Sequence, residues 1–189
     1  MNFDKYSELE GKHALLSPSK YYWLNYDEEK MRAYYKSVFA AEKGTEYHEH
    51  AAWLIENRIK LKKTKQTDNM YVNDCIGFNM TPEVCLYYNQ YCFGHADAIS
   101  FDEKKNLLRI FDLKTGTAPA RMEQLMIYAA IFSLQYADEI PDVYGMDIEL
   151  RIYQSNEILE HHPTGTEVIE VAKRIMEASK LIKEIATEV

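Results

Sequence analysis

The stretch FDLKTG, residues 111–116, places an aspartate and a lysine at the point where an apolar run ends. Asp112 and Lys114 are two residues apart, so on a β-strand their side chains point to the same face. A carboxylate can hold a divalent cation, and a neighbouring lysine can orient the water that attacks a substrate. The same residues also suit the charged end of an ordinary strand, so the stretch alone leaves both interpretations open.

Two segments flanking the polar turn DEKKN, residues 93–101 and 106–114, are typical of an antiparallel hairpin. A turn centred between Lys104 and Lys105 pairs the residues on either side symmetrically. The expected pairs, read outward from the turn, are Phe101 with Leu108, Ile99 with Ile110, Asp97 with Asp112, and His95 with Lys114. Directly opposed Cβ atoms lie about 4.5–5.5 Å apart, so two facing aspartates require compensation by a cation, a shared proton or Lys114.

The composition is that of a folded globular protein. Its 189 residues are 47% hydrophobic and 28% charged, which predicts a single domain over residues 1–189 with a substantial core. The net charge of −8 argues against a protein that coats nucleic acid, but it does not exclude an enzyme with a local basic groove. No apolar run reaches the ~20 residues of a membrane span, and the opening residues lack a secretory signal. We therefore expect no membrane partner. The three cysteines form no disulfide or zinc pattern, so we expect a cytoplasmic protein.

Hydrophobic periodicity predicts a mixed α/β fold with an antiparallel meander at its centre. Helices are expected from the Ser17-Pro18 start, over about 28–40, over 44–63, near 68–79, over 119–137 and over 164–188. Strands are expected over 83–89, 93–101, 106–114 and 145–154. The chain is therefore expected to comprise a helical N-terminal part (1–65), a sheet with one helix (83–154) and a C-terminal helix (164–188).

Two helical segments carry polar residues that could face the hairpin. Gln124 and Tyr128 are four residues apart and so share a helix face, although a polar flank beside the apolar stripe also explains them. His48 lies on the same side of its helix as Ala51 and Ile55 and is expected to face inward, where a hydrogen-bonded core histidine is the ordinary finding. Neither helix alone decides between a structural and a catalytic role.

Four short motifs follow one another along the chain: GTEYH (44–48), GHAD (94–97), DLK (112–114) and QLMIY (124–128). Together with the SPSKYYW opening they resemble the RecB-type branch of the PD-(D/E)xK nucleases, which includes phage recombination exonucleases. That branch has a helical histidine, a G-x-x-D strand, a D/E-x-K strand and a Q-x-x-x-Y helix. The resemblance spans roughly residues 15–137 and implies a restriction-endonuclease-like core, in which helices flank a central mixed sheet.

The resemblance implies a Mg²⁺ or Mn²⁺ site made of two carboxylates, a main-chain oxygen and an imidazole, supplied by Asp97, Asp112, the backbone carbonyl of Leu113, and His48. Lys114 would orient the attacking water and help to deprotonate it. Gln124 and Tyr128 would brace the site or contact the nucleic-acid strand. These roles are chemically consistent, because a bound metal acidifies water and stabilises charge on phosphoryl oxygens.

The sequence departs from the family pattern in small ways. Ala96 rather than proline precedes Asp97, which is common in this branch. No cysteine follows Cys92, so we expect no iron–sulfur cluster. Glu83 begins the preceding strand and fits a solvated strand end better than a metal ligand.

By resemblance, the expected activity is that of a divalent-metal-dependent deoxyribonuclease, a hydrolase acting as an exonuclease in DNA recombination, repair or phage replication. The partner would be DNA in a bacterial or phage-infected cell, and a recombination or single-strand-annealing protein or a second copy of the chain could join it. Basic residues could line a path for phosphates: Arg58, Lys60, Lys62, Lys63, Lys65, Lys104, Lys105, Arg109 and Arg121. The alternatives are a catalytically inactive nuclease-like module that binds nucleic acid or a partner protein, a metal enzyme acting on another substrate, and a structural phage protein with a coincidental motif.

Overall fold

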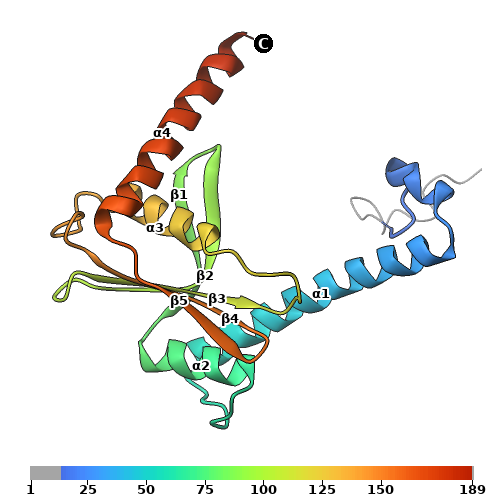
Figure 1. Cartoon of the computed structure of the whole chain (residues 1–189), viewed down its shortest axis with the longest axis horizontal. Helices are drawn as coiled ribbons and strands as arrows, with labels where there is room; N and C mark the ends of the chain where they lie inside the picture. Colours follow the sequence, from blue (N-terminus) through green and yellow to red (C-terminus); the bar gives the residue numbers. More distant parts are fainter. Residues whose placement is uncertain (1–13, 189) are drawn as a thin grey trace, which may run out of the picture. The chain divides into compact units, whose positions relative to one another are not determined.

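The computed structural model describes residues 14–188, and its contacts divide the chain into two compact units, Met1–Glu46 and Tyr47–Val189 (Figure 1). The described part of the first unit contains the 3-10 helix η2 (Pro18–Asn25) and the start of α1 (Glu28–Glu56). Among these described residues no hydrophobic side chain is buried, so this part has no core of its own. The predicted single domain over residues 1–189 stays a prediction.

The helix predicted to begin at Ser17 and Pro18 is present, but it is a 3-10 helix with a kink at Lys20. Ser17 occupies the N-cap position without bonding a helix amide through its side chain. Its hydroxyl instead lies 2.8 Å from the hydroxyl of Ser19, a short-range bond that competes with capping.

Helix α1 corrects the prediction of two helices over 28–40 and 44–63, because the chain is helical without a break from Glu28 to Glu56. Gly44 is tolerated because the residues on both sides are good helix formers. The helix ends at Glu56, seven residues before the predicted limit of 63. Just after this end, Arg58 adopts a left-handed φ of 54°. The Ile59 amide then donates to the Leu54 carbonyl at 2.9 Å and the Arg58 amide to the Ile55 carbonyl at 3.0 Å, which is a Schellman ending. The basic segment 58–65 therefore lies outside the helix.

Helix α2 (Thr67–Gly77) confirms the helix predicted near 68–79 and leads directly into the sheet. It ends in the same manner as α1, with Asn79 at φ 53° and the Met80 amide donating to the Cys75 carbonyl at 2.9 Å. The C-terminal part of α1 packs together with α2 against one face of the sheet. Their shared core includes Leu54, Ile55, Tyr71, Val72, Phe111, Leu113 and Tyr153.

The sheet has five strands in the order β1-β2-β3-β4-β5. The first three, β1 (Thr81–Asn89), β2 (Cys92–Asp102) and β3 (Leu107–Lys114), form the predicted antiparallel meander. Strand β4 (Asp147–Gln154) matches most of the segment predicted over 145–154 and lies parallel to β3. The fold is thus mixed α/β with a five-stranded mixed sheet flanked by helices, as predicted at this level.

Strand β5 (Glu157–His161) was not predicted from the sequence. It pairs antiparallel with β4 through a two-residue turn, Ser155-Asn156, in which both φ angles are positive, at 52° and 65°. Positive φ at both turn positions is the signature of a type I′ hairpin turn, in which asparagine is favoured. The Ser155-Asn156 dipeptide is therefore the sequence feature from which a hairpin, and so β5, could have been predicted.

The β2–β3 register confirms the predicted turn centre, because Ile99 pairs with Ile110 and Phe101 with Leu108. The ladder stops at Ala98–Phe111, so the predicted pairs of Asp97 with Asp112 and of His95 with Lys114 do not form. The backbone amide of Leu113 instead donates to Oδ2 of Asp97 at 2.8 Å. A side-chain oxygen of Asp97 thus accepts a hydrogen bond from β3 just beyond the end of the ladder.

Helix α3 (Glu123–Gln135) covers the opposite face of the sheet, and the first turns of α4 (Gly165–Glu188) add Val168 and Ala172 to the same core. Both confirm the helices predicted over 119–137 and 164–188. The apolar stripe predicted for α3 consists of Met122, Leu125, Ala129 and Phe132; the last three are buried, and Met122 is half-buried at the N-cap position. Thr164 and Glu167 form a capping box at the start of α4, with the Thr164 amide donating to the Glu167 carboxylate at 2.8 Å. Within residues 14–188 there is no helix long and apolar enough to span a membrane.

Candidate metal centre

Strand β2 changes faces at Asp97. Ala96 belongs to the core beneath α3, whereas Ala98 belongs to the core formed with α1 and α2, although residues two apart in a regular strand share a face. Opposite Asp97, between the pairs Pro82–Ala98 and Val84–Ala96, Glu83 has a left-handed φ of 52°. Figure 1 shows the outer part of the β1–β2 hairpin turned away from β3 and β4. The two acids therefore mark a bend in the hairpin, and left-handed backbone in a strand residue is strained.

His48, Glu83 and Asp97 each present one ligand atom to a common point, and these atoms all lie within 4.8 Å of one another. Nδ1 of His48, on α1, is 3.3 Å from Oδ2 of Asp97. This contact raises the pKa of His48, and partial burial together with the charge of Asp97 raises the pKa of Glu83. The structure thus places Glu83 beside His48 and Asp97, while its side chain is exposed, as expected for a solvated strand end.

Asp112 is the most deeply buried acid of the centre, with 2% of its surface exposed. Burial and the charge of Asp97 raise its pKa to about 6, against the opposing effect of Lys114. Nζ of Lys114 lies 3.0 Å from both carboxylate oxygens, but only its contact with Oδ1 has hydrogen-bond geometry. Oδ2 of Asp112 is therefore a buried acceptor without a hydrogen-bond partner. A buried oxygen of this kind, beside the second carboxylate of Asp97, fits a hard divalent cation.

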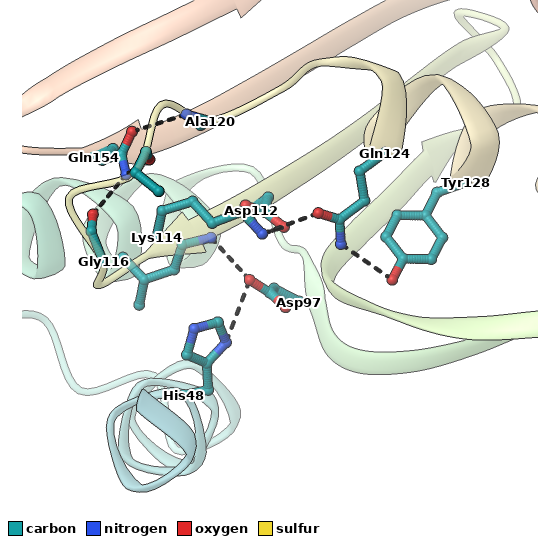
Figure 2. Close-up of polar contacts among 11 residues, drawn as sticks. His48, Asp97, Asp112, Lys114, Gly116, Ala120, Gln124, Tyr128 and Gln154 are labelled. Atoms are coloured by element: carbon teal, nitrogen blue, oxygen red, sulfur yellow. Dashed lines mark hydrogen bonds and ion pairs between the residues drawn. The ribbon is translucent and has the colours of Figure 1, made fainter. Parts of the chain in front are cut away.

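Lys114 is held by two elements at once. Its ammonium group donates to Asp112 on its own strand and to Oε1 of Gln124 on α3, the latter at 3.0 Å (Figure 2). Gln124 in turn donates from Nε2 to the Tyr128 hydroxyl at 3.4 Å. The predicted lysine, glutamine and tyrosine therefore form one hydrogen-bonded chain that leads away from the carboxylates.

The segment that follows β3 is fixed by Gln154 at the end of β4. Its Nε2 donates to the carbonyls of Gly116 at 2.6 Å and Ala118 at 2.9 Å, and its Oε1 accepts from the Ala120 amide at 3.3 Å (Figure 2). This residue was not singled out in the sequence. Its side chain holds the link between β3 and α3, the two elements that carry Lys114 and Gln124.

Leu113 occupies the position between the two functional residues of β3. Its side chain is buried, and its amide donates to Asp97. The role of its carbonyl as a metal ligand stays a prediction. The predicted side chains thus form two groups. His48 and Asp97 cluster with Glu83, and Asp112, Lys114, Gln124 and Tyr128 form a chain of contacts. The Leu113 amide links the groups through Asp97, and Asp112 is not part of the three-residue cluster.

Arg109, one of the basic residues predicted to line a path for phosphates, makes contacts within the fold. Its Nε donates to the Glu149 carboxylate at 2.6 Å, and its guanidinium stacks 4.5 Å from the centre of the Phe78 ring. Arg58 is also engaged, because its Nη2 donates to the Asn79 side chain at 2.7 Å. These two arginines thus make contacts within the fold, and the path for phosphates stays a prediction.

We expect the metal-free protein to lose stability as the pH rises, because the pKa of Asp112 is raised from 3.8 to about 6. The folded state then binds more protons than the unfolded state between these values, so the free energy of unfolding falls from about pH 4 to about pH 6 and stays low above that. The limiting effect is about 3 kcal/mol. Urea unfolding in EDTA should show Asp112→Asn gaining stability over the wild type with rising pH, and a difference independent of pH would contradict the assignment.

Comparison of the chain with models of protein families, with curated protein sequences and with solved structures gave no match. Its class must therefore be inferred from the fold and the site. The fold is a mixed five-stranded sheet flanked by helices, and the site combines two aspartates with a lysine at adjoining strand ends. This combination is the basis of the functional proposal.

Proposed function

We propose that the protein is a divalent-metal-dependent deoxyribonuclease with a restriction-endonuclease-like core, a member of the RecB-type branch of the PD-(D/E)xK nucleases. The observation that carries the proposal is Oδ2 of buried Asp112, which accepts no hydrogen bond although Nζ of Lys114 lies 3.0 Å away, together with the charge of nearby Asp97. The order of elements adds support, since an antiparallel hairpin is followed by a helix and then by a strand parallel to β3.

Asp97 and Asp112 would hold the cation, with His48 and Glu83 as further ligands and the Leu113 carbonyl as a main-chain ligand. When bound, a Mg²⁺ or Mn²⁺ ion lowers the pKa of water and stabilises charge on phosphoryl oxygens. Asp112 binds a cation as the carboxylate, so the raised pKa makes binding pH-dependent.

Lys114 would supply a fixed positive charge next to the attacked phosphorus, and this charge would orient the attacking water and favour its deprotonation. Asp112 and Gln124 hold its ammonium group from two sides, which limits its movement before the reaction. Tyr128 would restrain Gln124 in turn, so that the chain of three residues positions one charge.

A nuclease assay with defined DNA tests this function. Linear duplex, linear single-stranded DNA and covalently closed circles should be incubated with Mg²⁺ or Mn²⁺, and in parallel with EDTA. We expect the linear substrates to be degraded only when metal is present and the circles to survive, because an exonuclease requires an end. Degradation that persists in EDTA would contradict the metal site, and cleavage of closed circles would contradict exonuclease action alone.

Gly94→Ala should weaken the support of Lys114. A Cβ at this position would lie 3.0 Å from Cε1 of Tyr128 and 3.3 Å from its hydroxyl, so the ring has to move and the contact with Gln124 is disturbed. We expect roughly a tenfold loss of nuclease rate, as for other supporting contacts of metal sites. The matched control is Gly77→Ala, where nothing lies within 4 Å of the added carbon. An equal loss of rate in both variants, measured with fluorescently end-labelled duplex, would contradict this role of Gly94.

A further inference from the structure

The outer part of the β1–β2 hairpin exposes one face that begins at the metal centre. Burial alternates along both strands, so that Leu86 and Ala96 are fully buried while Tyr87 and Phe93 are 51% and 58% exposed. Starting at Glu83 and Asp97, the outward positions are the paired residues Cys85–His95 and then the paired residues Tyr87–Phe93. The exposed aromatic pair and the acidic cluster therefore share one continuous strip of the sheet.

Tyr87 and Phe93 form an aromatic surface with no charge near them in the sequence. Their ring centroids are 6.1 Å apart with an interplanar angle of 36°, and Tyr91 at the hairpin turn is a third ring, 40% exposed. Residues 84–94 contain no Asp, Glu, Lys or Arg. Half-exposed rings contribute less to the stability of the fold than buried ones, because less of their apolar surface is removed from water. An exposed apolar face of this kind is typical of a binding site.

The hairpin edge next to Tyr87 is already occupied. The backbone amide of Tyr87 donates to Oε1 of Gln135 at 2.8 Å. An added strand from another chain would need this amide, so edge pairing with a second copy or with a peptide is disfavoured here. A ligand that uses the faces of the rings remains compatible with the contact.

We infer that Tyr87 and Phe93 stack against unpaired bases of the DNA strand whose phosphate reaches Asp97 and Asp112. This inference rests on the proposed nuclease function. Phe93 is four residues from Asp97 on β2, a span of about 13 Å. At the ~3.4 Å rise of stacked bases, this distance covers no more than about four nucleotides. An uncharged aromatic surface suits bases, whose faces all stack on aromatic rings regardless of sequence.

The unpaired state of the bases follows from the geometry of DNA. In a duplex the base faces are covered by the neighbouring pairs, and a protein reads only the edges in the grooves. Rings that project from a hairpin can reach base faces only in a single strand or at a duplex end. The aromatic pair therefore selects the single-stranded part of the substrate next to the cleaved phosphate.

Binding of a short fluorescent oligothymidylate tests the inference, with Asp112→Asn as the parent protein so that the probe is not degraded. Tyr87→Ala/Phe93→Ala should raise the Kd about 5- to 100-fold, the effect of losing base–aromatic stacking. Leucine at both positions should weaken binding to a similar extent, whereas Tyr87→Phe/Phe93→Tyr should preserve it within about twofold. The matched control is Tyr144→Ala, because Tyr144 is a 67% exposed tyrosine outside the hairpin.

The possible failures of the two proposals are distinguishable. Hydrolysis of bis(p-nitrophenyl) phosphate by the wild-type protein with Mn²⁺ needs no base, so its absence counts against the proposed function alone. If the ester is hydrolysed but the leucine variant binds the oligonucleotide like its parent, the stacking surface is overturned and the nuclease stands. An equal loss of affinity for a blunt duplex would also overturn it, because the rings would then bind the terminal pair instead of unpaired bases.

Discussion

Replacing Asp112 by asparagine is expected to reduce metal-dependent DNA hydrolysis by about a thousandfold or more. The amide removes the negative charge that a divalent cation needs, and Oδ2 of Asp112 is a buried oxygen that accepts no hydrogen bond. The fold should survive, because the substitution keeps the shape of the side chain and removes a charge whose burial raises its pKa to about 6. Initial rates on end-labelled linear duplex with Mn²⁺ measure the effect.

The metal-induced change in melting temperature gives an independent readout for the same variant. At a hundredfold excess of Mn²⁺ over its Kd, the wild type should gain about 2.7 kcal/mol of stability, which is several degrees for a protein of this size. Asp112→Asn should gain almost none. The matched control is Asp147→Asn, an exposed aspartate at the start of β4, and it should behave like the wild type in both measurements. Full activity in Asp112→Asn would exclude this carboxylate from the site.

Lys114→Ala should lower the rate of hydrolysis by about 10²–10³-fold, the size observed when one fixed stabilising group is removed from an active site. It differs from Asp112→Asn in that the carboxylate ligands stay in place. The Mn²⁺-induced rise in melting temperature should therefore persist. Loss of the lysine also removes a charge that lowers the pKa of Asp112, so metal binding should need a higher pH than in the wild type.

The control for this variant is Lys180→Ala, which removes an 81% exposed lysine side chain from α4. Both variants should be measured at pH 7 and at pH 9, so that weaker metal binding is separated from slower chemistry. A Lys114→Ala protein that regains the wild-type rate at pH 9 would show that the lysine acts only on the pKa of Asp112. A rate within threefold of the wild type at both values would remove Lys114 from the chemistry.

Local sequence patterns were sufficient to predict the central hairpin. The apolar pairs Ile99–Ile110 and Phe101–Leu108 fixed the turn centre, because a shift by one residue would move every side chain to the other face. The period of 3.6 residues likewise located α3 and the positions of Gln124 and Tyr128 on one side of it. Lys114 is the last residue of β3, and its ammonium group donates a hydrogen bond to Gln124 on α3.

The bend at the site could not be predicted in this way. A regular ladder would have placed Asp97 directly opposite Asp112, but β2 changes faces at Asp97 and uses its carboxylate to accept the Leu113 amide. The left-handed φ of Glu83 belongs to the same bend and turns this residue into the cluster. Its cause is tertiary, since two cores on opposite sides of the sheet require Ala96 and Ala98 to face different ways.

The most direct test of the proposed centre is the anomalous scattering of crystals grown with Mn²⁺. We expect one strong peak within bonding distance of a carboxylate oxygen of Asp97 and of Oδ2 of Asp112, next to the site of Lys114. Additional coordination by His48 or Glu83 is compatible with this expectation, because both lie beside Asp97. A peak that contacts neither aspartate, or no peak at a Mn²⁺ concentration that supports DNA cleavage, would contradict the central claim.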